Sequence, residues 1–197
     1  MTSSQIIVLA TPVFLGLIAI ELVVGHLRGR NTYRVGDAIS SIGLGMMSEV
    51  AKLFSRLLVG GLYVLAYQQF AVFQLDATSP WVWIGALLGY DFCYYWYHRA
   101  GHRVAVLWAA HAVHHQSEDY NLSTALRQTS SGFFFGWIFY LPMAVLGFPV
   151  LVFVVVGLID LLYQYWIHTE QVGKLGWFDR VFASPSNHRV HHSVNDK

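Results

Sequence analysis

The residues best suited to chemistry in this 197-residue chain are its histidines. Residues 98–115, HRAGHRVAVLWAAHAVHH, carry five of them, and residues 187–192, NHRVHH, carry three more. Because residues three or four apart share one face of an α-helix, each group can direct two or three imidazoles at one point. The eight candidates are His98, His102, His111, His114, His115, His188, His191 and His192.

A group of neighbouring imidazoles is difficult to stabilise without a cation. Protonated rings would repel one another, and neutral rings would each leave a lone pair without a donor. A divalent metal solves both problems, and imidazole is a good ligand for Zn, Cu, Fe and Ni. Because one ion takes four to six ligands, the eight histidines predict two ions.

Three other residues have a less certain relation to this site. His168, in YQYWIHTE, is equally compatible with a metal ligand and with an interfacial histidine. His26 lies near a basic loop and is not expected to be a ligand. Asp91 lies in an apolar segment, where a carboxylate usually faces a protein interior or a functional cavity.

The residue types exclude two common metal chemistries. A zinc protease of the H-E-x-x-H type needs a glutamate base where HRAGH has Arg99. A haem protein needs a pair of axial ligands, far fewer than are present. All-histidine ligation without thiolate fits a non-haem diiron centre that activates oxygen for attack on a lipid chain, although the spacing alone does not separate iron from zinc. Cys93, the only cysteine, is expected to be a small buried residue.

Composition indicates an integral membrane protein. Hydrophobic residues make up 55% of the chain and charged residues 12%, with a mean hydropathy of +0.47. Soluble domains average about 25% charged residues. The net charge of +1 gives no reason to expect a nucleic-acid partner.

The first part of the chain predicts two membrane-crossing elements. Residues 6–24 are apolar over a length that spans a hydrocarbon core of about 30 Å. The arginines that follow, at 28, 30 and 34, place the first loop in the cytoplasm. Residues 38–73 predict a helix that begins along the cytoplasmic surface and crosses from about Leu57. Lys52 and Arg56 are expected at the interface, with contact to a lipid headgroup or an anionic substrate as the alternative.

The second part of the chain predicts elements that place the histidine groups on one side of the membrane. Residues 81–97 predict a span with aromatic residues at both ends. Residues 133–166 predict a helical hairpin broken at Gly147-Phe148-Pro149. The predicted fold is an all-α, multi-pass integral membrane bundle of about four to five hydrophobic helices, with a cytoplasmic histidine-rich dimetal face. We expect residues 1–80 to form N-terminal membrane helices and residues 81–197 to form the catalytic domain.

The motifs HRAGH, HAVHH and HRVHH resemble the three histidine boxes of the fatty acid hydroxylase / sterol desaturase superfamily of membrane diiron enzymes. The similarity covers about residues 91–196, and YNLSTALRQ, residues 120–128, resembles the branch that cleaves ether lipids. The resemblance implies that the eight histidines are iron ligands and adds His168 to them. It also implies residues that orient imidazoles or line a substrate pocket. These are Asp91, Glu118, Asn121 and Asn187, the last at a position where relatives often carry another histidine.

The implied function is O2-dependent hydroxylation of a lipid chain, next to the ether oxygen if the lipid is an ether. Electrons must come from an external donor, since no haem, flavin or nucleotide motif is present, and tetrahydrobiopterin is implied by the resemblance alone. The alternatives are a sterol desaturase or fatty acid hydroxylase acting on another lipid, a metal-binding membrane protein without oxygen chemistry, and a non-catalytic family fragment. Relatives continue beyond the third box, so we expect the chain, which ends at Lys197, to be truncated.

Overall fold

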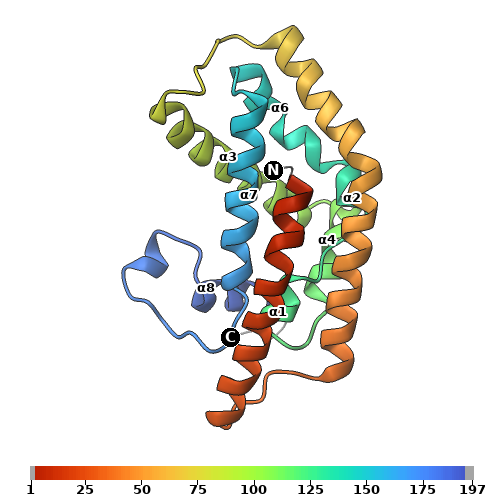
Figure 1. Cartoon of the computed structure of the whole chain (residues 1–197), viewed down its shortest axis with the longest axis vertical. Coiled ribbons are helices and arrows are strands. Elements are labelled where there is room, and N and C mark those ends of the chain that lie inside the picture. Colours follow the sequence, from red (N-terminus) through yellow and green to blue (C-terminus); the bar gives the residue numbers. More distant parts are fainter. Residues whose placement is uncertain (1–2, 194–197) are drawn as a thin grey trace. The chain divides into compact units, whose positions relative to one another are not determined.

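The computed structural model describes residues 3–193, without the side chains of residues 3–8 and of Arg56. The expectation for Arg56, and the last residues of the expected catalytic domain, therefore lie outside the described residues. Every regular element of the described chain is helical, as expected (Figure 1). The α-helices are α1 (Ser3–Leu27), α2 (Val35–Phe70), α3 (Pro80–Gly101), α4 (Ala105–His115), α5 (Leu122–Ala125), α6 (Gly136–Leu146), α7 (Val150–Trp166) and α8 (Pro185–His191), and the 3-10 helices are η1 (Gly132–Phe134) and η2 (Phe178–Arg180).

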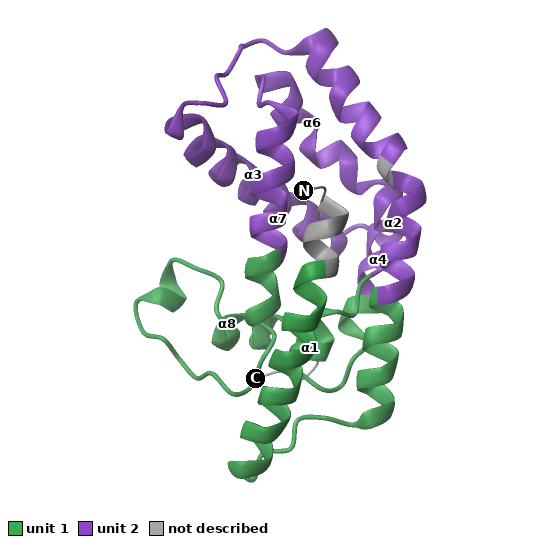
Figure 2. Cartoon of the chain, viewed as in Figure 1, with its two compact units in different colours: residues 1–45, 113–128, 162–197 green, residues 46–112, 129–161 purple. Residues whose placement is uncertain are grey.

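The chain forms two compact units, each made of segments that are distant in sequence (Figure 2). Unit 1 comprises residues 1–45, 113–128 and 162–197. Unit 2 comprises residues 46–112 and 129–161. The expected boundary at residue 81 separates N-terminal membrane helices from a catalytic domain. It is a boundary of function and not of compactness, and it stays a prediction.

Unit 2 is built around an apolar core between α2, α3, α6 and α7. Its buried residues are Tyr63, Ala86, Cys93, Met143, Ala144, Val152 and Val156. Small side chains let α3 and α6 approach, since Ala86 and Ala144 are both 0% exposed. The expected burial of Cys93 is confirmed at 7% exposure.

The predicted break is confirmed, with α6 and α7 separated by the turn at Gly147-Phe148-Pro149, and the return of the two helices to one membrane face stays a prediction. Gly147 ends α6 in the left-handed region with φ 93°, where glycine is the residue that fits without strain. A Cβ there would lie 1.9 Å from the carbonyl oxygen of Phe73. The loop between α2 and α3 therefore passes directly over this turn, and Val72 N–H donates to the Val145 carbonyl at 2.8 Å.

Unit 1 has a smaller core in which α1 packs on α5 and on the end of α7. Its buried members are Ile18, Leu122, Ala125 and Tyr165. Tyr165 stacks on Phe14 of α1 with ring centroids 4.3 Å apart, and its hydroxyl donates to the Phe14 carbonyl at 2.8 Å. These contacts fix α1 to the end of α7, just before His168.

By length and composition, one helix in the described part of the chain can cross a membrane, and a bent pair gives a second candidate. The first is Leu9–Leu27. The second is formed by the two arms of α2, Val35–Ser55 and Leu57–Phe70, which are inclined by 49°. The break in α2 coincides with the expected change of direction near Leu57. Helices α6 and α7 are apolar but shorter than a full span.

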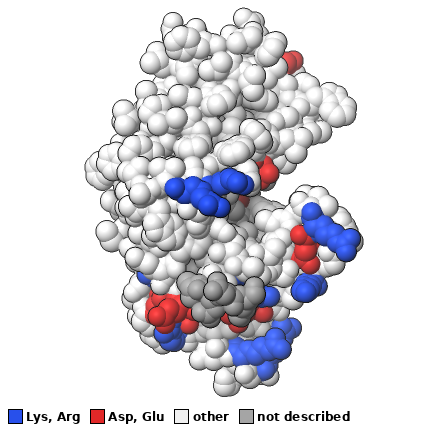
Figure 3. All heavy atoms as spheres, turned by 180° about the vertical axis from the view of Figure 1, so that it is seen from behind, with Lys and Arg blue, Asp and Glu red and all other residues white. Residues whose placement is uncertain are grey.

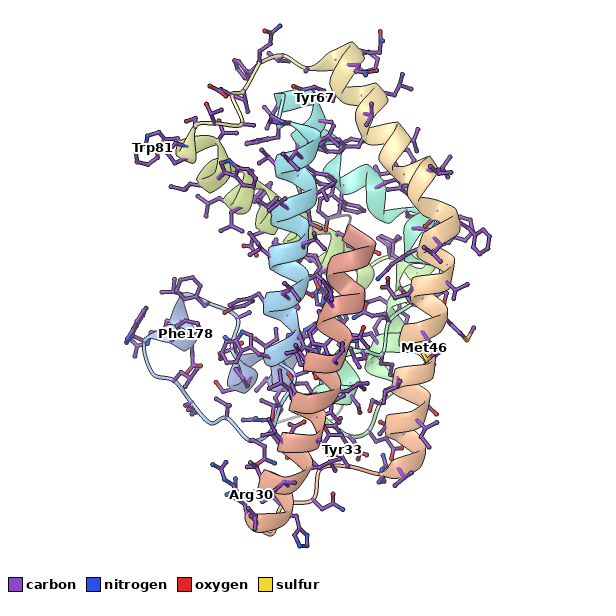
Figure 4. All side chains as sticks on the ribbon, in the orientation of Figure 1. Arg30, Tyr33, Met46, Tyr67, Trp81 and Phe178 are labelled. Atoms are coloured by element: carbon purple, nitrogen blue, oxygen red, sulfur yellow. The ribbon has the colours of Figure 1, made fainter. Side chains whose placement is uncertain are left out.

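Much of the surface is apolar. Figure 3 shows wide areas without a charged side chain. Figure 4 shows Met46 and Trp81 projecting from their helices, and they are 67% and 77% exposed. Large exposed apolar patches mark surfaces that contact lipid or another protein. These areas suit a chain that lies in a bilayer.

We expect Gly147→Ala to lower the free energy of unfolding by about 3 kcal/mol, because it adds a Cβ in a left-handed conformation against the Phe73 backbone. The matched control is Gly61→Ala in α2, where a Cβ would meet nothing within 4 Å. This control should be neutral or stabilising by up to about 1 kcal/mol. Denaturant titration in detergent measures both, and equal midpoints would contradict the described turn.

Candidate metal centre

Three of the expected ligands converge in unit 2. The Nε2 atom of His111 lies 3.2 Å from His98 Nε2 and 3.1 Å from His102 Nε2. All three side chains are half-buried. Burial lowers the pKa of His102, which favours the neutral ring that can bind a metal.

The local structure explains this convergence. His98 and His102 are one turn apart at the C-terminal end of α3 and therefore share a face. A tight turn then leads into α4, which brings His111 back toward them. A Cβ at Gly101 would lie 3.4 Å from the His111 Cβ. The end of α3 therefore lies directly against the His111 side chain of α4.

Four other expected ligands converge in unit 1. They are His114, His168, His188 and His192, and their ligand nitrogens all lie within 4.8 Å of one another. His168 Nε2 is 3.1 Å from both His114 Nε2 and His188 Nε2. These four residues, which we call the quartet, come from the end of α4, the segment after α7, and α8.

The last two expected ligands, His115 and His191, face each other in unit 1 with ring centroids 4.8 Å apart. His115 also stacks on His192 of the quartet at 4.2 Å. Each of the nine expected ligands therefore has another expected ligand as a ring neighbour. His26, which was not expected to be a ligand, is exposed in the last turn of α1.

The distances within each group fit nitrogens that share a cation. Two lone pairs directed at each other across about 3 Å repel, unless a proton or a metal lies between them. With metal–nitrogen bonds of about 2.1 Å, ligands at right angles are about 3.0 Å apart and opposite ligands about 4.2 Å apart. The quartet is therefore close to the size of one coordination sphere.

His192 gives a second observation that fits a cation site. Its Nε2 atom is buried and has no hydrogen-bond partner in the described structure. Buried polar atoms without a partner are rare and costly in proteins. Burial, followed by the neighbouring imidazoles, holds the pKa of His192 well below its usual value. The residues present thus fit a metal ion.

Two quartet rings are oriented by backbone carbonyls. The Nδ1 of His114 lies 2.9 Å from the Arg127 carbonyl, and the Nδ1 of His168 lies 2.7 Å from the Gln164 carbonyl. Because a carbonyl oxygen only accepts, Nδ1 must carry the proton in both rings. The lone pair is then on Nε2, which points to the other quartet members, and this is the usual arrangement behind a metal-binding histidine.

Arg127 is a functional residue that the sequence analysis missed. Its side chain is buried, and Nε donates to the Val113 carbonyl at 2.8 Å. Its guanidinium also lies 3.6 Å from the carboxylate of Asp37 and donates to the Ser41 hydroxyl. Arg127 thus holds the residue before His114 with its side chain and the His114 ring with its carbonyl. A charged residue within the otherwise neutral YNLSTALRQ was the available signal.

Tyr120 is a second missed residue. Its hydroxyl donates to the Ile167 carbonyl at 2.9 Å, next to His168. Its ring centroid lies 5.2 Å from that of His192. Burial raises the pKa of Tyr120 far above its usual value, so this hydroxyl remains a donor. Tyr120 therefore fixes the backbone beside one ligand and packs against another.

The two expected asparagines hold short helices. Asn187 accepts from Ser184 N–H at 2.8 Å within the capping box that begins α8, directly before His188. Asn121 is 1% exposed, caps α5, and donates to the Thr32 carbonyl at 2.6 Å. Each asparagine thus shapes the backbone near the quartet, and any contact with a substrate stays a prediction.

Asp91 and Glu118 lie at exposed positions. Asp91 is on α3, whose buried residues Ala86 and Cys93 are on another face of the helix. Glu118 pairs with Arg34 at 2.8 Å and lines a polar cavity of about 440 Å³. A role for either carboxylate in orienting an imidazole or lining a substrate pocket stays a prediction.

We expect Arg127→Met to lower the free energy of unfolding by about 3 kcal/mol, because it removes a buried guanidinium and leaves half-buried Asp37 without its cation. The matched control is Arg34→Met, which breaks ion pairs with exposed Glu118 and half-buried Asp119 from an arginine that is itself 56% exposed. Exposed pairs contribute little, so the control should unfold close to the parent. Chemical unfolding of both variants checks this, and similar losses would contradict the assigned burial.

Comparisons with known proteins agree with the histidine pattern. The model of the fatty acid hydroxylase family matches residues 83–197. Alkylglycerol monooxygenases from Homo sapiens and Danio rerio are each 46% identical over 187 residues, which cover 94% of this chain and 42% of the relative. The Caenorhabditis elegans alkylglycerol monooxygenase is 37% identical over 171 residues, covering 87% of this chain and 33% of the relative. No solved structure matches the chain.

The chain therefore spans less than half the length of these relatives. Their identity to this chain confirms the resemblance expected from the histidine boxes and from YNLSTALRQ. The family match covers all the expected ligands and begins close to the residue expected to open the catalytic domain. With its clustered imidazoles and this match over more than half its length, the chain belongs to the fatty acid hydroxylase family.

Proposed function

We propose that this chain carries the metal centre of a membrane-bound diiron oxygenase that hydroxylates ether lipids, as its alkylglycerol monooxygenase relatives do by name. The observation that carries the proposal is the convergence of histidine nitrogens, without thiolates, in a chain of this family. Soft thiolate ligands would favour zinc or iron–sulfur chemistry, whereas imidazole also suits iron.

We assign the nine clustered histidines as the ligands of two iron ions. They are His98, His102, His111, His114, His115, His168, His188, His191 and His192. When bound, the iron would supply the activation of O2 for insertion into a C–H bond. The chain itself holds the ligand nitrogens, fixes their tautomers through backbone carbonyls, and keeps His114 and His168 away from water.

The proposed reaction balances with an external two-electron donor. One oxygen atom of O2 enters a C–H bond next to the ether oxygen, and the other leaves as water after taking up two electrons and two protons. The resulting hemiacetal breaks into an aldehyde and a glycerol derivative. Tetrahydrobiopterin is the electron donor that the family resemblance suggests. Asp91, Glu118, Asn121 and Asn187 complete the expected surroundings of the ligands and the substrate.

The proposed setting is a bilayer, crossed by α1 and α2 and further by the apolar helices of residues 81–197, in a bundle of about four to five helices. Arg28, Arg30 and Arg34 favour a cytoplasmic first loop. The histidines would then face the cytoplasm, where a soluble electron donor is available. The substrate, a lipid, would reach the site from the membrane.

The reaction class is tested with the purified protein loaded with Fe²⁺ in lipid nanodiscs. Aldehyde release from an alkylglycerol, dependent on O2 and on tetrahydrobiopterin, would support the proposal, and ¹⁸O from O2 should appear in the aldehyde before exchange with water. Oxidation of a sterol or an acyl chain instead would favour the other family activities. Iron-loaded protein that oxidises none of these lipids would contradict the proposal that the chain is part of an enzyme.

We expect His114→Ala to lose about half of the bound iron, because it removes a buried member of one coordination sphere. The matched control, His26→Ala, removes an exposed imidazole and should keep the parent iron content. Elemental analysis per chain measures both variants. Equal iron content in the two would show that the ligand assignment is wrong.

A further inference from the structure

The carboxylate of Glu21 is buried in an otherwise apolar helix. It is 5% exposed on α1, within the segment Leu9–Leu27 that can cross a membrane. Burying a carboxylate is costly unless donors surround it. Glu21 also lies outside residues 83–197, which the family model covers. Its burial therefore requires an explanation from this chain's own contacts.

Three donors from three segments converge on Glu21. The Tyr33 hydroxyl and the Leu122 backbone N–H both donate to Oε2, the latter at 2.8 Å. The Thr169 hydroxyl donates to Oε1. A carboxylate suits this position because it only accepts and has room for several donors. Figure 4 shows Tyr33 in the loop after α1, and burial followed by the bond to Glu21 raises its pKa, so Tyr33 remains a donor.

The first of two connections runs from Glu21 to His168. This ligand candidate lies just past α7, and its backbone N–H donates to the Tyr165 carbonyl at 3.4 Å. Its neighbour Thr169 is 6% exposed, donates to Glu21, and accepts from Gln171 N–H at 3.1 Å. Glu21 thus fixes the residue that follows His168, while Tyr120 fixes the one that precedes it.

The second connection runs from Glu21 to His114. Leu122, whose N–H binds Glu21, is the first residue of the short helix α5. Arg127, two residues after the end of α5, provides the carbonyl that binds His114 Nδ1 at 2.9 Å. The carboxylate therefore fixes one end of a short segment, and the other end sets the orientation of the His114 ring.

We propose that Glu21 is a positioning residue that holds His168 and His114, two of the four quartet histidines, in the register required to share one metal ion. The proposal rests on the proposed metal-binding role of the quartet. Glu21 does not touch the quartet rings through any bond described above, so it acts through Thr169 and α5. All residues in this argument belong to unit 1.

The test targets the Thr169 hydroxyl, which donates to Glu21 and accepts from Gln171 N–H. Thr169→Val removes the hydroxyl that binds Glu21 and keeps the shape of the side chain, whereas Thr169→Ser keeps the hydroxyl and should behave as the parent. The matched control is Thr32→Val, because the Thr32 hydroxyl is buried in the same unit without a hydrogen-bond partner. Glu21→Gln changes the acceptor of the same hydrogen bond.

Co²⁺ is the probe, because its visible absorption reports ligand geometry without lipid turnover. Changes in the hydrogen bonds that orient metal ligands typically weaken metal binding about 10- to 100-fold. We expect Thr169→Val and Glu21→Gln to weaken the binding of one Co²⁺ by about this factor and to alter its spectrum. The double variant should lose less than the sum of the two single losses, since both substitutions change the bond between Thr169 and Glu21.

Hydrogen exchange of the metal-free protein gives a second measurement. Peptides covering residues 166–171 and 120–127 should exchange faster in Glu21→Gln, and the former faster in Thr169→Val. Unchanged Co²⁺ spectra and unchanged exchange in both variants would overturn the proposal, as would an equal effect of Thr32→Val. A protein that binds Co²⁺ as expected but oxidises no lipid would contradict the proposed reaction and leave this role of Glu21 supported. Failure of the parent to bind Co²⁺ would overturn both.

Discussion

Imidazole nitrogens at 3.1–3.2 Å from one another are the feature on which the rest of this structure depends. Neutral rings cannot all donate and accept within such a group, and protonated rings would repel at these distances. A bound cation removes the conflict, while the protein must hold the rings in place before the cation arrives. The contacts behind the rings are therefore as important to the site as the rings themselves.

Those contacts are polar groups placed inside an apolar chain. A buried polar group is tolerated only when it is hydrogen-bonded, and unit 1 meets this condition with a small number of shared partners. Arg127 uses its side chain for Val113 and Asp37 and its carbonyl for His114. Glu21 accepts from three segments at once. Because each partner serves several groups, loss of one would disturb several positions together.

The sequence was sufficient to predict the helices and the ligand candidates, because both depend on local spacing. The four-residue interval from His98 to His102 and the turn at Gly147-Phe148-Pro149 each act within one or two turns of helix, and the length of residues 38–73 is read directly from the chain. The partners of Glu21 and Arg127 could not be predicted in this way. They lie up to 148 residues apart in sequence, and no periodic pattern relates them.

The exposed position of Asp91 is a second case in which the sequence could not predict the surroundings of a side chain. A carboxylate in an apolar stretch predicts an interior site, and that reasoning, applied above to Asp91, applies equally to Glu21 in the apolar residues 6–24. Asp91 lies on an exposed face of α3, whereas Glu21 is buried among donors. Composition marks both residues as costly in a membrane. Only the fold shows which of the two carboxylates is stabilised by hydrogen bonds, and this is Glu21.

The quartet is carried by the ends of helices and not by their interiors. His114 lies in the last turn of α4, His168 follows α7, His188 belongs to α8, a helix of seven residues, and His192 caps the C-terminal end of α8. Helices this short are not stable alone, so the capping box of Ser184 and Asn187 must set where α8 begins. Ends of helices leave backbone carbonyls free, and the Gln164 carbonyl in the last turn of α7 orients His168, while the Arg127 carbonyl just beyond α5 orients His114. A metal site built at helix ends thus obtains its orienting acceptors from the backbone, which lets an apolar chain hold a polar centre with few buried charges.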